Sequence, residues 1–558
     1  MKIYFLQVKG KSERDCYMSS KLIRGTFILT IGMVLSKLLG LLYVIPFNKI
    51  VGTEGMALYG FAYTPYTIFI SIATAGVPLA VAKFVAKYNA MGEYAVGRKL
   101  FESGRKIMML TGVAAFLIMY ISAPGLAAVM DTQKYSIDDV TTVIRAVSFA
   151  LILVPSLSLL RGFFQGYESM GPTAVSQVIE QIVRIIVMLA GAFIVLNVLD
   201  GNVVQAMSVA TFSAFIGAIS GFVVLLWYWK KRKHHLDQMM NEGKNEIDIS
   251  LKEIYKEIIV SSIPFIFVGL AMPLFQMVDT VTFNRAMVSI GQGAITDEAF
   301  GVLNVTTQKL VLIPMTLATA FSLSIVPSVT KSFVEQKWKL YKQQLTETFQ
   351  TLLFILIPAV VGISVLSESV YGSFYGFSDL GSDVLKVYSP VAILFALFSV
   401  TAAIMQGINQ QRFTVLSLLT GILIKLSLNI PLIKMFETKG AVYATAIGYA
   451  VSTIINLYII YYFTGYRIKP VLKRALLSLI FAGIMALAVW GLDQFLAAMV
   501  GSKGQLVAIL RVGLTVPFGI LIYFFLSIKS GLLHVIFGER TDGLLRKLKL
   551  NRFVREKE

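Results

Sequence analysis

Residues 203–229 read VVQAMSVATFSAFIGAISGFVVLLWYW, a run of 27 residues without a charged side chain. A helix needs about 20 predominantly apolar residues to cross the roughly 30 Å hydrocarbon core of a bilayer, so this run is long enough to span it. Similar uncharged runs occupy 107–130 and 387–408. The chain is 56% hydrophobic and 15% charged, which is too little charge to cover a soluble protein of 558 residues. The sequence therefore predicts an all-α integral membrane protein.

We expect about fourteen transmembrane helices, arranged as two six-helix lobes and an additional C-terminal pair. The expected spans are 22–48, 56–82, 107–130, 140–164, 173–196, 203–229, 258–284, 300–330, 348–367, 386–408, 413–433, 440–464, 475–492 and 508–528. The corresponding domains are an N-terminal cytoplasmic extension (1–20), an N-lobe (21–230), a charged cytoplasmic linker (231–256), a C-lobe (257–466), the C-terminal pair (467–534) and a basic cytoplasmic tail (535–558).

Short matches at a nearly constant offset indicate that the C-lobe repeats the N-lobe. Gln165-Gly166 recurs as Gln406-Gly407, and the same offset of 241 residues places Arg184 opposite Lys425. "FNK" at 47–49 recurs as "FNR" at 283–285 with a small indel. Six spans return the chain to the same side of the membrane, so the repeats have parallel topology. Repeats of this kind are typical of transporters that bind substrate centrally and move by alternating access.

The net charge of +19 is distributed unevenly along the chain. With the N-terminus inside, the external segments carry six of the 50 Lys and Arg residues: Lys49, Lys134, Arg285, Lys434, Lys439 and Lys503. This asymmetry follows the positive-inside rule and places both termini in the cytoplasm. The basic clusters at 230–233 and 546–557 then need only face anionic phospholipids, so no nucleic-acid partner is expected.

Ionisable residues within the spans are mostly basic. Charges at this depth are unfavourable and usually face an interior cavity, so a cationic interior favours an anionic substrate, with phosphate the leading candidate. Lys37 and Lys309 have no acid within a helical turn and are the first substrate-binding candidates, and Arg161 and Arg184 are the second. Arg184 has an alternative, because Glu180 lies one turn away and could pair with it.

Four further charges in or near the spans have other expected roles. Asp279 and Lys425 are the acid and the cation deep in the second lobe, so we expect an ion pair between spans seven and eleven. Lys386 and Arg511 lie near span ends, where long side chains usually extend to the membrane surface.

The sequence lacks the residue patterns of common enzyme and metal sites. It has no P-loop pattern, no His inside a span and a single cysteine, Cys16, on the cytoplasmic side. We therefore expect neither an enzyme nor a metal or organic cofactor.

Four stretches resemble one family of membrane proteins. They are SKLLGLLYVIPFNKIVG (36–52), ATAGVPLAVAKFVAKY (73–88), RGFFQGYESMGPTAVSQVIEQIVRI (161–185) and QKLVLIPMTLATAFSLSIVPSVTKSF (308–333). They are similar to bacterial lipid II flippases of the MurJ/SpoVB type, within the multidrug/oligosaccharidyl-lipid/polysaccharide exporter superfamily. The resemblance covers nearly the whole chain.

The resemblance implies translocation of an undecaprenyl-diphosphate-linked peptidoglycan precursor across the bacterial plasma membrane. Lys37 and Lys309 occupy positions of cavity cations in the family, and the final two spans would border a groove for the lipid tail. The chain departs from the family at Tyr43-Val44, where an Arg-Asp pair is expected, and near Phe69, where a cavity arginine is expected.

The driving force is less well defined by the resemblance. An inside-negative membrane potential would aid outward movement of the anionic substrate. Some family members use a sodium site in spans seven and eleven. Here Asp279 matches the first part of that site, whereas span eleven offers Lys425 and Asn429, so a tethered ammonium could replace the ion.

Alternatives remain open on sequence alone. A flippase for another undecaprenyl-linked glycan, such as a capsule or teichoic-acid precursor, would carry the same cations. A non-transporting scaffold that binds cell-wall synthesis enzymes is another reading. A drug antiporter is disfavoured by the cationic interior.

Overall fold

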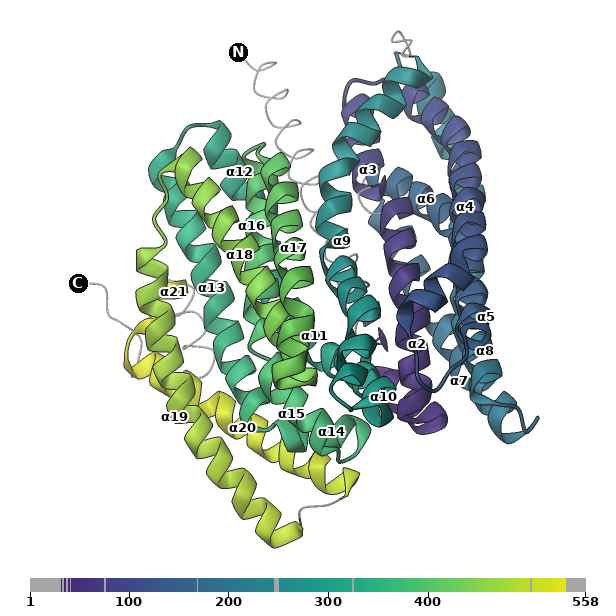
Figure 1. The fold of residues 1–558 in the computed structure, drawn as a ribbon. Coiled ribbons are helices and arrows are strands. Elements are labelled where there is room, and N and C mark those ends of the chain that lie inside the picture. The colour runs from purple at the N-terminus through teal and green to yellow at the C-terminus, as the bar shows by residue number, and fades with distance from the viewer. Residues whose placement is uncertain are drawn as a thin grey trace. The chain divides into compact units, whose positions relative to one another are not determined.

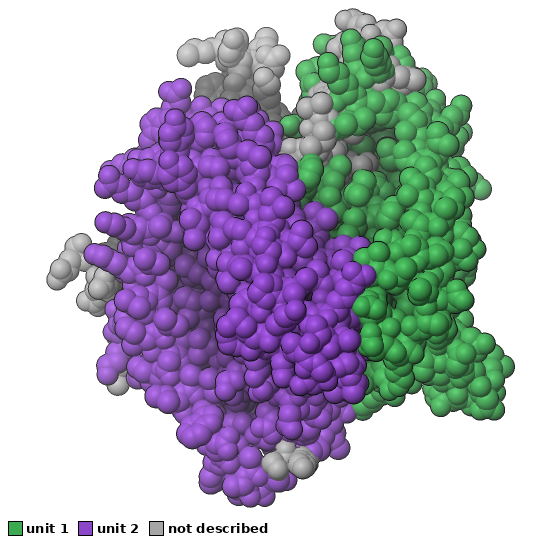
Figure 2. Space-filling model, in the orientation of Figure 1, with its two compact units in different colours: residues 1–273 green, residues 274–558 purple. Residues whose placement is uncertain are grey.

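The computed structural model describes residues 32–537 except for 33–34, 37–38, 41, 75–76, 168, 245–249, 324–325 and 502–503. The expected extension at 1–20, Lys37 and most of the expected first span and of the tail lie outside the described residues. The chain divides into two compact units, residues 1–273 and 274–558 (Figure 2). The regular elements of both are helices (Figure 1).

Unit 1 contains seven α-helices and one short 3₁₀ helix among its described residues, and α9 (Leu251–Ser289) begins in it and continues into unit 2. The elements are α2 (Val44–Thr74), α3 (Val77–Ala90), α4 (Tyr94–Met130), α5 (Ile137–Ser148), η1 (Phe149–Ile152), α6 (Val154–Gly166), α7 (Met170–Asn197) and α8 (Val203–Glu242). Gly52 divides α2, because its φ of 70° and ψ of 177° lie outside the helical region.

Helices α7 and α8 pack along each other through two glycines of α8. A Cβ atom at Gly217 would lie 2.9 Å from Arg184 Cβ, and one at Gly221 would lie 3.2 Å from Glu180 Cβ. Glycine thus permits the close approach of two helix backbones that small residues commonly provide in membrane proteins. The packing fixes the stretch of α7 that carries Glu180 and Arg184.

Unit 2 contains the end of α9, twelve further α-helices, a 3₁₀ turn and a π-helix within its described part. They are η2 (Gly293–Ile295), α10 (Thr296–Gly301), the π-helix η3 (Val302–Thr307), α11 (Gln308–Leu323), α12 (Val326–Val334), α13 (Trp338–Val365), α14 (Ser367–Tyr375), α15 (Asp379–Tyr388), α16 (Val391–Gly407), α17 (Gln411–Phe436), α18 (Thr438–Thr464), α19 (Lys469–Val500), α20 (Gln505–Lys529) and α21 (Leu532–Phe537).

Eleven helices of the described residues are long and apolar enough to cross a membrane, or twelve if α15 and α16, bent by 41°, form one span. This confirms the predicted all-α membrane fold. The two expected spans without a counterpart have clear reasons. Most of 22–48 lies outside the described residues, and 300–330 falls across α10, η3, α11 and α12, of which α11 is only 16 residues long.

The two units share local structure at corresponding places. Ser136 caps α5 and Ser378 caps α15, each by accepting a backbone hydrogen bond at the start of a broken span. These two spans end at Gly166 and Gly407, the glycines of the repeated Gln-Gly pair. The next two helices pack together in each unit, α7 with α8 and α17 with α18. The matches predicted from the sequence thus fall at equivalent points of the helix order.

Helices α19 and α20 form a hairpin that contacts α13 and α14. Arg511 of α20 is 1% exposed and binds Asp493 of α19. The expectation that Arg511 extends to the membrane surface is therefore wrong, because its guanidinium turns inward to a carboxylate on the neighbouring helix. Lys386 is exposed near the end of α15, as expected.

Candidate functional site: intramembrane cations and an apolar cavity

The charged residues singled out from the sequence are distributed over both units. Arg161 of α6 and Arg184 of α7 lie in unit 1, and Lys309 of α11 lies in unit 2. Lys37 lies outside the described residues. Each unit therefore carries its own set of intramembrane cations.

Arg161 is neutralised by a carboxylate of the next helix. Its Nη2 lies 2.6 Å from Glu180 Oε2 and donates a second hydrogen bond to Ser176 Oγ at 2.9 Å. Ser176 Oγ in turn donates to the carbonyl oxygen of Gly221. Glu180 could have paired with Arg184 one turn later, but it pairs with Arg161 instead. The local net charge of this pair is zero.

Arg184 instead points to tyrosines of α2. Its Nη2 donates to the hydroxyl oxygen of Tyr63 at 2.9 Å and lies 3.5 Å from that of Tyr59. The two rings stack with centroids 4.8 Å apart, and the guanidinium lies over the Tyr63 ring. The Tyr59 hydroxyl is 3.2 Å from that of Tyr43. The positive charge of Arg184 is therefore surrounded by aromatic rings and phenol oxygens.

Lys309 is the second residue of α11, which follows the π-helix directly, and it is half-buried. The preceding residue, Gln308, is buried and accepts a hydrogen bond of 2.6 Å from Gln276 on α9. Gln276 also donates to the carbonyl oxygen of Asn304, at 3.5 Å. These amides anchor the start of α11, and so fix the backbone that carries Lys309.

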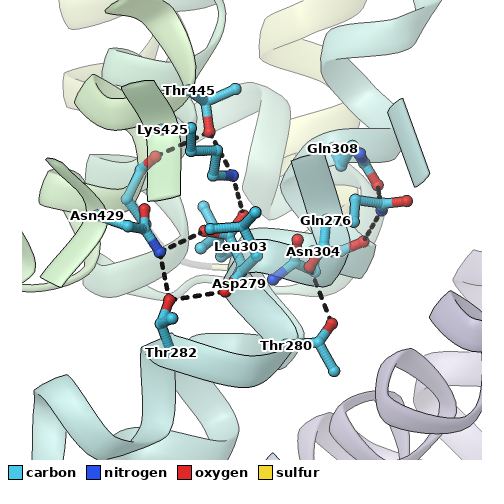
Figure 3. A network of polar contacts seen from close by, with 12 residues as sticks. Gln276, Asp279, Thr280, Thr282, Leu303, Asn304, Gln308, Lys425, Asn429 and Thr445 are labelled. Carbon is cyan, nitrogen blue, oxygen red and sulfur yellow. Dashed lines mark hydrogen bonds and ion pairs between the residues drawn. The ribbon is translucent and has the colours of Figure 1, made fainter. Parts of the chain in front are cut away.

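Asp279 and Lys425 are brought together in the interior of unit 2 (Figure 3). Lys425 Nζ on α17 donates to Asp279 Oδ2 at 2.6 Å and to Thr445 Oγ1 on α18 at 2.9 Å. Asn429 Nδ2 donates to Asp279 Oδ1 at 3.1 Å and to Thr282 Oγ1 at 2.7 Å. The ammonium thus fills a site lined by oxygens and joins three helices.

The amides near Lys309 were not identified from the sequence. Asn304 Nδ2 is buried and has no hydrogen-bond partner among the described residues. The available signal was the polar run Asn304 to Gln308 inside an otherwise apolar span, where each side chain must be accommodated away from lipid. π-Helices are rare in proteins overall, and those that occur are frequently at functional sites. We therefore include this segment in the candidate site.

An apolar cavity of about 640 Å³ lies among α11, α13, α19 and α20 in unit 2. Its walls carry almost exclusively hydrocarbon side chains: Ile313, Pro314, Phe354, Ile355, Pro358, Ala359, Gly362, Ile363, Leu366, Val370, Met485, Val489, Thr515, Val516, Gly519, Ile520, Tyr523, Phe524 and Leu533. Such a cavity suits an aliphatic chain and offers nothing to a charged group. The chain therefore combines intramembrane cations with a separate apolar cavity in unit 2.

Comparison with known proteins shows the family. The model of the family "Polysaccharide biosynthesis protein" matches residues 22–333. The lipid II flippase MurJ of Bacillus subtilis (strain 168) is 47% identical over 542 residues, which cover 95% of this chain and 99% of that protein. This chain belongs to the MurJ family. Its resemblance to that family, first inferred from four short stretches, is confirmed, and the family consists of transporters rather than enzymes.

A more distant relative and two solved structures are also similar to this MurJ-family protein. The stage V sporulation protein B of Bacillus subtilis (strain 168) is 24% identical, over 73% of this chain and 76% of its own. A solved lipid II flippase MurJ in an inward closed conformation superposes with a TM-score of 0.63 at 16% identity, covering 90% of this chain and 98% of its own. An inward-facing MATE family transporter of the MOP superfamily gives 0.60 at 13% identity, covering 78% and 97%.

Proposed function

We propose that this protein is a lipid II flippase, which moves undecaprenyl-diphosphate-linked peptidoglycan precursor from the inner to the outer leaflet of the bacterial plasma membrane. The observation that carries the proposal is the 47% identity to the Bacillus subtilis flippase over nearly the full length of both chains. The match covers 95% of this chain and 99% of the relative, so it extends over both units and the C-terminal hairpin.

The proposed mechanism separates the charged and the aliphatic parts of the substrate. Lys37 and Lys309, assisted by Arg161 and Arg184, neutralise the diphosphate while the sugar-peptide headgroup crosses by alternating access. The apolar cavity beside α19 and α20 accommodates part of the prenyl tail, because burial of hydrocarbon there is favourable and no polar group competes. An inside-negative potential assists the outward movement of the anion by roughly 2.3 kcal/mol per charge per 100 mV.

The proposed orientation places both termini in the cytoplasm. The excess of Lys and Arg on the corresponding loops supports it. The basic segment within α8, Lys230 to Lys233, would then lie at the inner surface and contact anionic phospholipids. Cell-wall synthesis enzymes are the candidate protein partners on either side.

The test is exposure of lipid II in the outer leaflet of a bacterium depleted of its own flippases and expressing this chain. Wild type and the Lys37→Ala/Lys309→Ala variant are compared at equal membrane levels. The proposal expects exposure with wild type and a strong loss with the double variant. Exposure with both retains the flippase and removes these two lysines from its site. Absence of exposure with well-inserted wild type contradicts the proposed substrate.

A second candidate substrate is another polyprenyl-linked glycan. A probable low-salt glycan biosynthesis flippase, Agl15 of Haloferax volcanii, is 24% identical over 183 residues, or 32% of this chain and 39% of that protein. Rescue of a strain lacking such a glycan flippase, without rescue of lipid II exposure, would favour this candidate. The much longer match to the lipid II flippase makes it the second choice.

A further inference from the structure

We propose that Arg184 and the hydroxyls of Tyr59 and Tyr63 form an oxyanion seat in unit 1 that binds the diphosphate of the transported lipid. This inference rests on the proposed function and deepens it, because it assigns one part of the substrate to one group of side chains. It also changes the order of the candidates, since Arg184 takes the first place and Arg161 loses its role in direct binding.

Arg184 carries a positive charge that its hydrogen-bond partners do not neutralise. In the described part of the chain, the groups that accept hydrogen bonds from Arg184 are neutral phenol oxygens, and its Nε is buried without a partner. The nearest acid along α7, Glu180, is bound to Arg161 at 2.6 Å. A guanidinium held at membrane depth without a counter-charge is unfavourable, and an anion brought to it relieves that cost.

The two repeats carry different partners for the corresponding cation. The offset of 241 residues that relates the Gln-Gly pairs places Arg184 opposite Lys425, and the offset of 236 that relates "FNK" to "FNR" places Tyr43 opposite Asp279. In unit 2 the carboxylate neutralises the cation at 2.6 Å. In unit 1 the corresponding residue is a phenol, whose hydroxyl is 3.2 Å from that of Tyr59 beside Arg184.

The two repeats therefore hold a cation at the same place but differ in its partner. The repeat with the carboxylate is closed to an external anion, because its ammonium already has Asp279 and Thr445. Among the described residues of unit 1, the hydrogen-bond partners of the corresponding cation are uncharged phenols, and the neighbouring Glu180 is paired with Arg161. An anion-binding site requires a cation that is not already paired with a carboxylate. By this criterion unit 1, rather than unit 2, binds the diphosphate.

The geometry of the seat suits phosphoryl oxygens. A guanidinium presents a planar fork of donors that matches phosphate, and such charge-assisted hydrogen bonds are the strong ones. The Tyr63 oxygen accepts from Arg184, so its own proton remains free to be donated to an arriving oxygen. Stacking of the two rings holds both hydroxyls beside the same guanidinium nitrogen. Tyr59 is 3% exposed, so the aromatic wall limits competition by water.

The experiment measures binding rather than transport. The full-length protein in nanodiscs of zwitterionic lipid is titrated with radiolabelled undecaprenyl diphosphate and, separately, with uncharged undecaprenol. Arg184→Gln should weaken diphosphate binding about tenfold or more, equivalent to about 1.4 kcal/mol, and leave undecaprenol binding unchanged. Arg184→Lys should fall between wild type and Arg184→Gln, because it keeps the charge and loses the fork.

The matched control is the equivalent position of the other repeat. The Asp279→Asn/Lys425→Gln double variant removes the corresponding cation together with its carboxylate, so net charge is preserved. Its affinity for undecaprenyl diphosphate should equal that of wild type. If Arg184→Gln gives no folded protein, Tyr59→Phe/Tyr63→Phe takes its place. That variant keeps the rings, loses the hydroxyls and should weaken diphosphate binding about fivefold or more.

Several outcomes would overturn the seat. They are an unchanged diphosphate affinity in folded Arg184→Gln, an equal loss for undecaprenol, a loss of the same size in the control, or wild type that does not distinguish the two lipids. Failure of the proposed function looks different. Wild type would then bind the diphosphate through Arg184 and still fail to expose lipid II in cells.

Discussion

Arg511 of α20 and Asp493 of α19 form a two-point ion pair inside the C-terminal hairpin. Arg511 Nε lies 2.9 Å from Asp493 Oδ1, and Nη2 lies 2.6 Å from Oδ2. Ser369 of α14 donates a third hydrogen bond to Oδ1 at 3.0 Å. The pair therefore attaches both helices of the hairpin to the body of unit 2, next to residues that line the apolar cavity.

Removing one member of this pair should destabilise the protein strongly. Arg511→Met leaves Asp493 as an unpaired buried charge, and the loss of one partner of a buried pair costs about 3–5 kcal/mol. Thermal unfolding of the purified protein in detergent measures the effect. The Arg511→Met/Asp493→Leu double variant, which leaves no charge behind, should recover most of the loss. If Arg511→Met were as stable as wild type, the ion pair would not stabilise the hairpin.

The Asp279–Lys425 pair should behave in the same way, with a further dependence on its amide. Lys425→Met leaves Asp279 charged in an apolar interior, where Asn429 is its remaining partner among the described residues, so folding should be impaired. Asp279→Asn should cost less than Lys425→Met, because an amide can still accept from the ammonium. Unfolding temperatures of the two variants, measured side by side, give the order. If Asp279→Asn left both stability and lipid II exposure intact, the pair would have no role.

Sodium should be dispensable for transport. Lys425 Nζ already lies within hydrogen-bond distance of the carboxylate and of a threonine oxygen, so the oxygens of this site have a permanent cation. Replacement of external and internal Na⁺ by N-methylglucamine should leave the rate of lipid II exposure in proteoliposomes unchanged at a fixed membrane potential. A rate that rises in proportion to Na⁺ would show a coupling site elsewhere in the chain.

Hydropathy predicted most of the fold because the physical requirement behind it is simple. An uncharged run such as 203–229 has to be a membrane helix, and α8 covers it. The prediction was less accurate where a span is assembled from pieces. Residues 300–330 were expected to form one span, yet a π-helix at 302–307 interrupts the regular winding, and no periodicity in the sequence marks it.

Ion pairs of the site could be predicted where a charged residue has few possible partners. They could not be predicted where helix packing determines which of several partners is in contact. Asp279 and Lys425 could be paired from the sequence because each was the deep charge of its sign in the second lobe. Glu180 had a neighbour one turn away on its own helix, but the structure gives it to Arg161 across a helix interface. Sequence spacing describes contacts within one helix. It does not show which face meets the next helix, which is also why the inward turn of Arg511 was missed.

The apolar cavity leads to a prediction about the length of the lipid tail. Ala359 of α13 lines the cavity, and Ala359→Trp would fill part of its roughly 640 Å³. If the prenyl tail lies there, this variant should weaken binding of undecaprenyl diphosphate, because less hydrocarbon can be buried. Binding of the much shorter farnesyl diphosphate should change little, since it depends mainly on the cations.

Leu487→Trp provides the matched control for this prediction. Leu487 lies on α19, is 73% exposed and is not among the residues that line the cavity. It adds the same side chain to a lipid-facing position, so both affinities should remain those of wild type. If folded Ala359→Trp bound the long and the short diphosphate as tightly as wild type, the tail would lie outside this cavity. A loss of equal size for both lipids would instead point to a disturbed cation site, because only the long chain has enough hydrocarbon to respond to a smaller cavity.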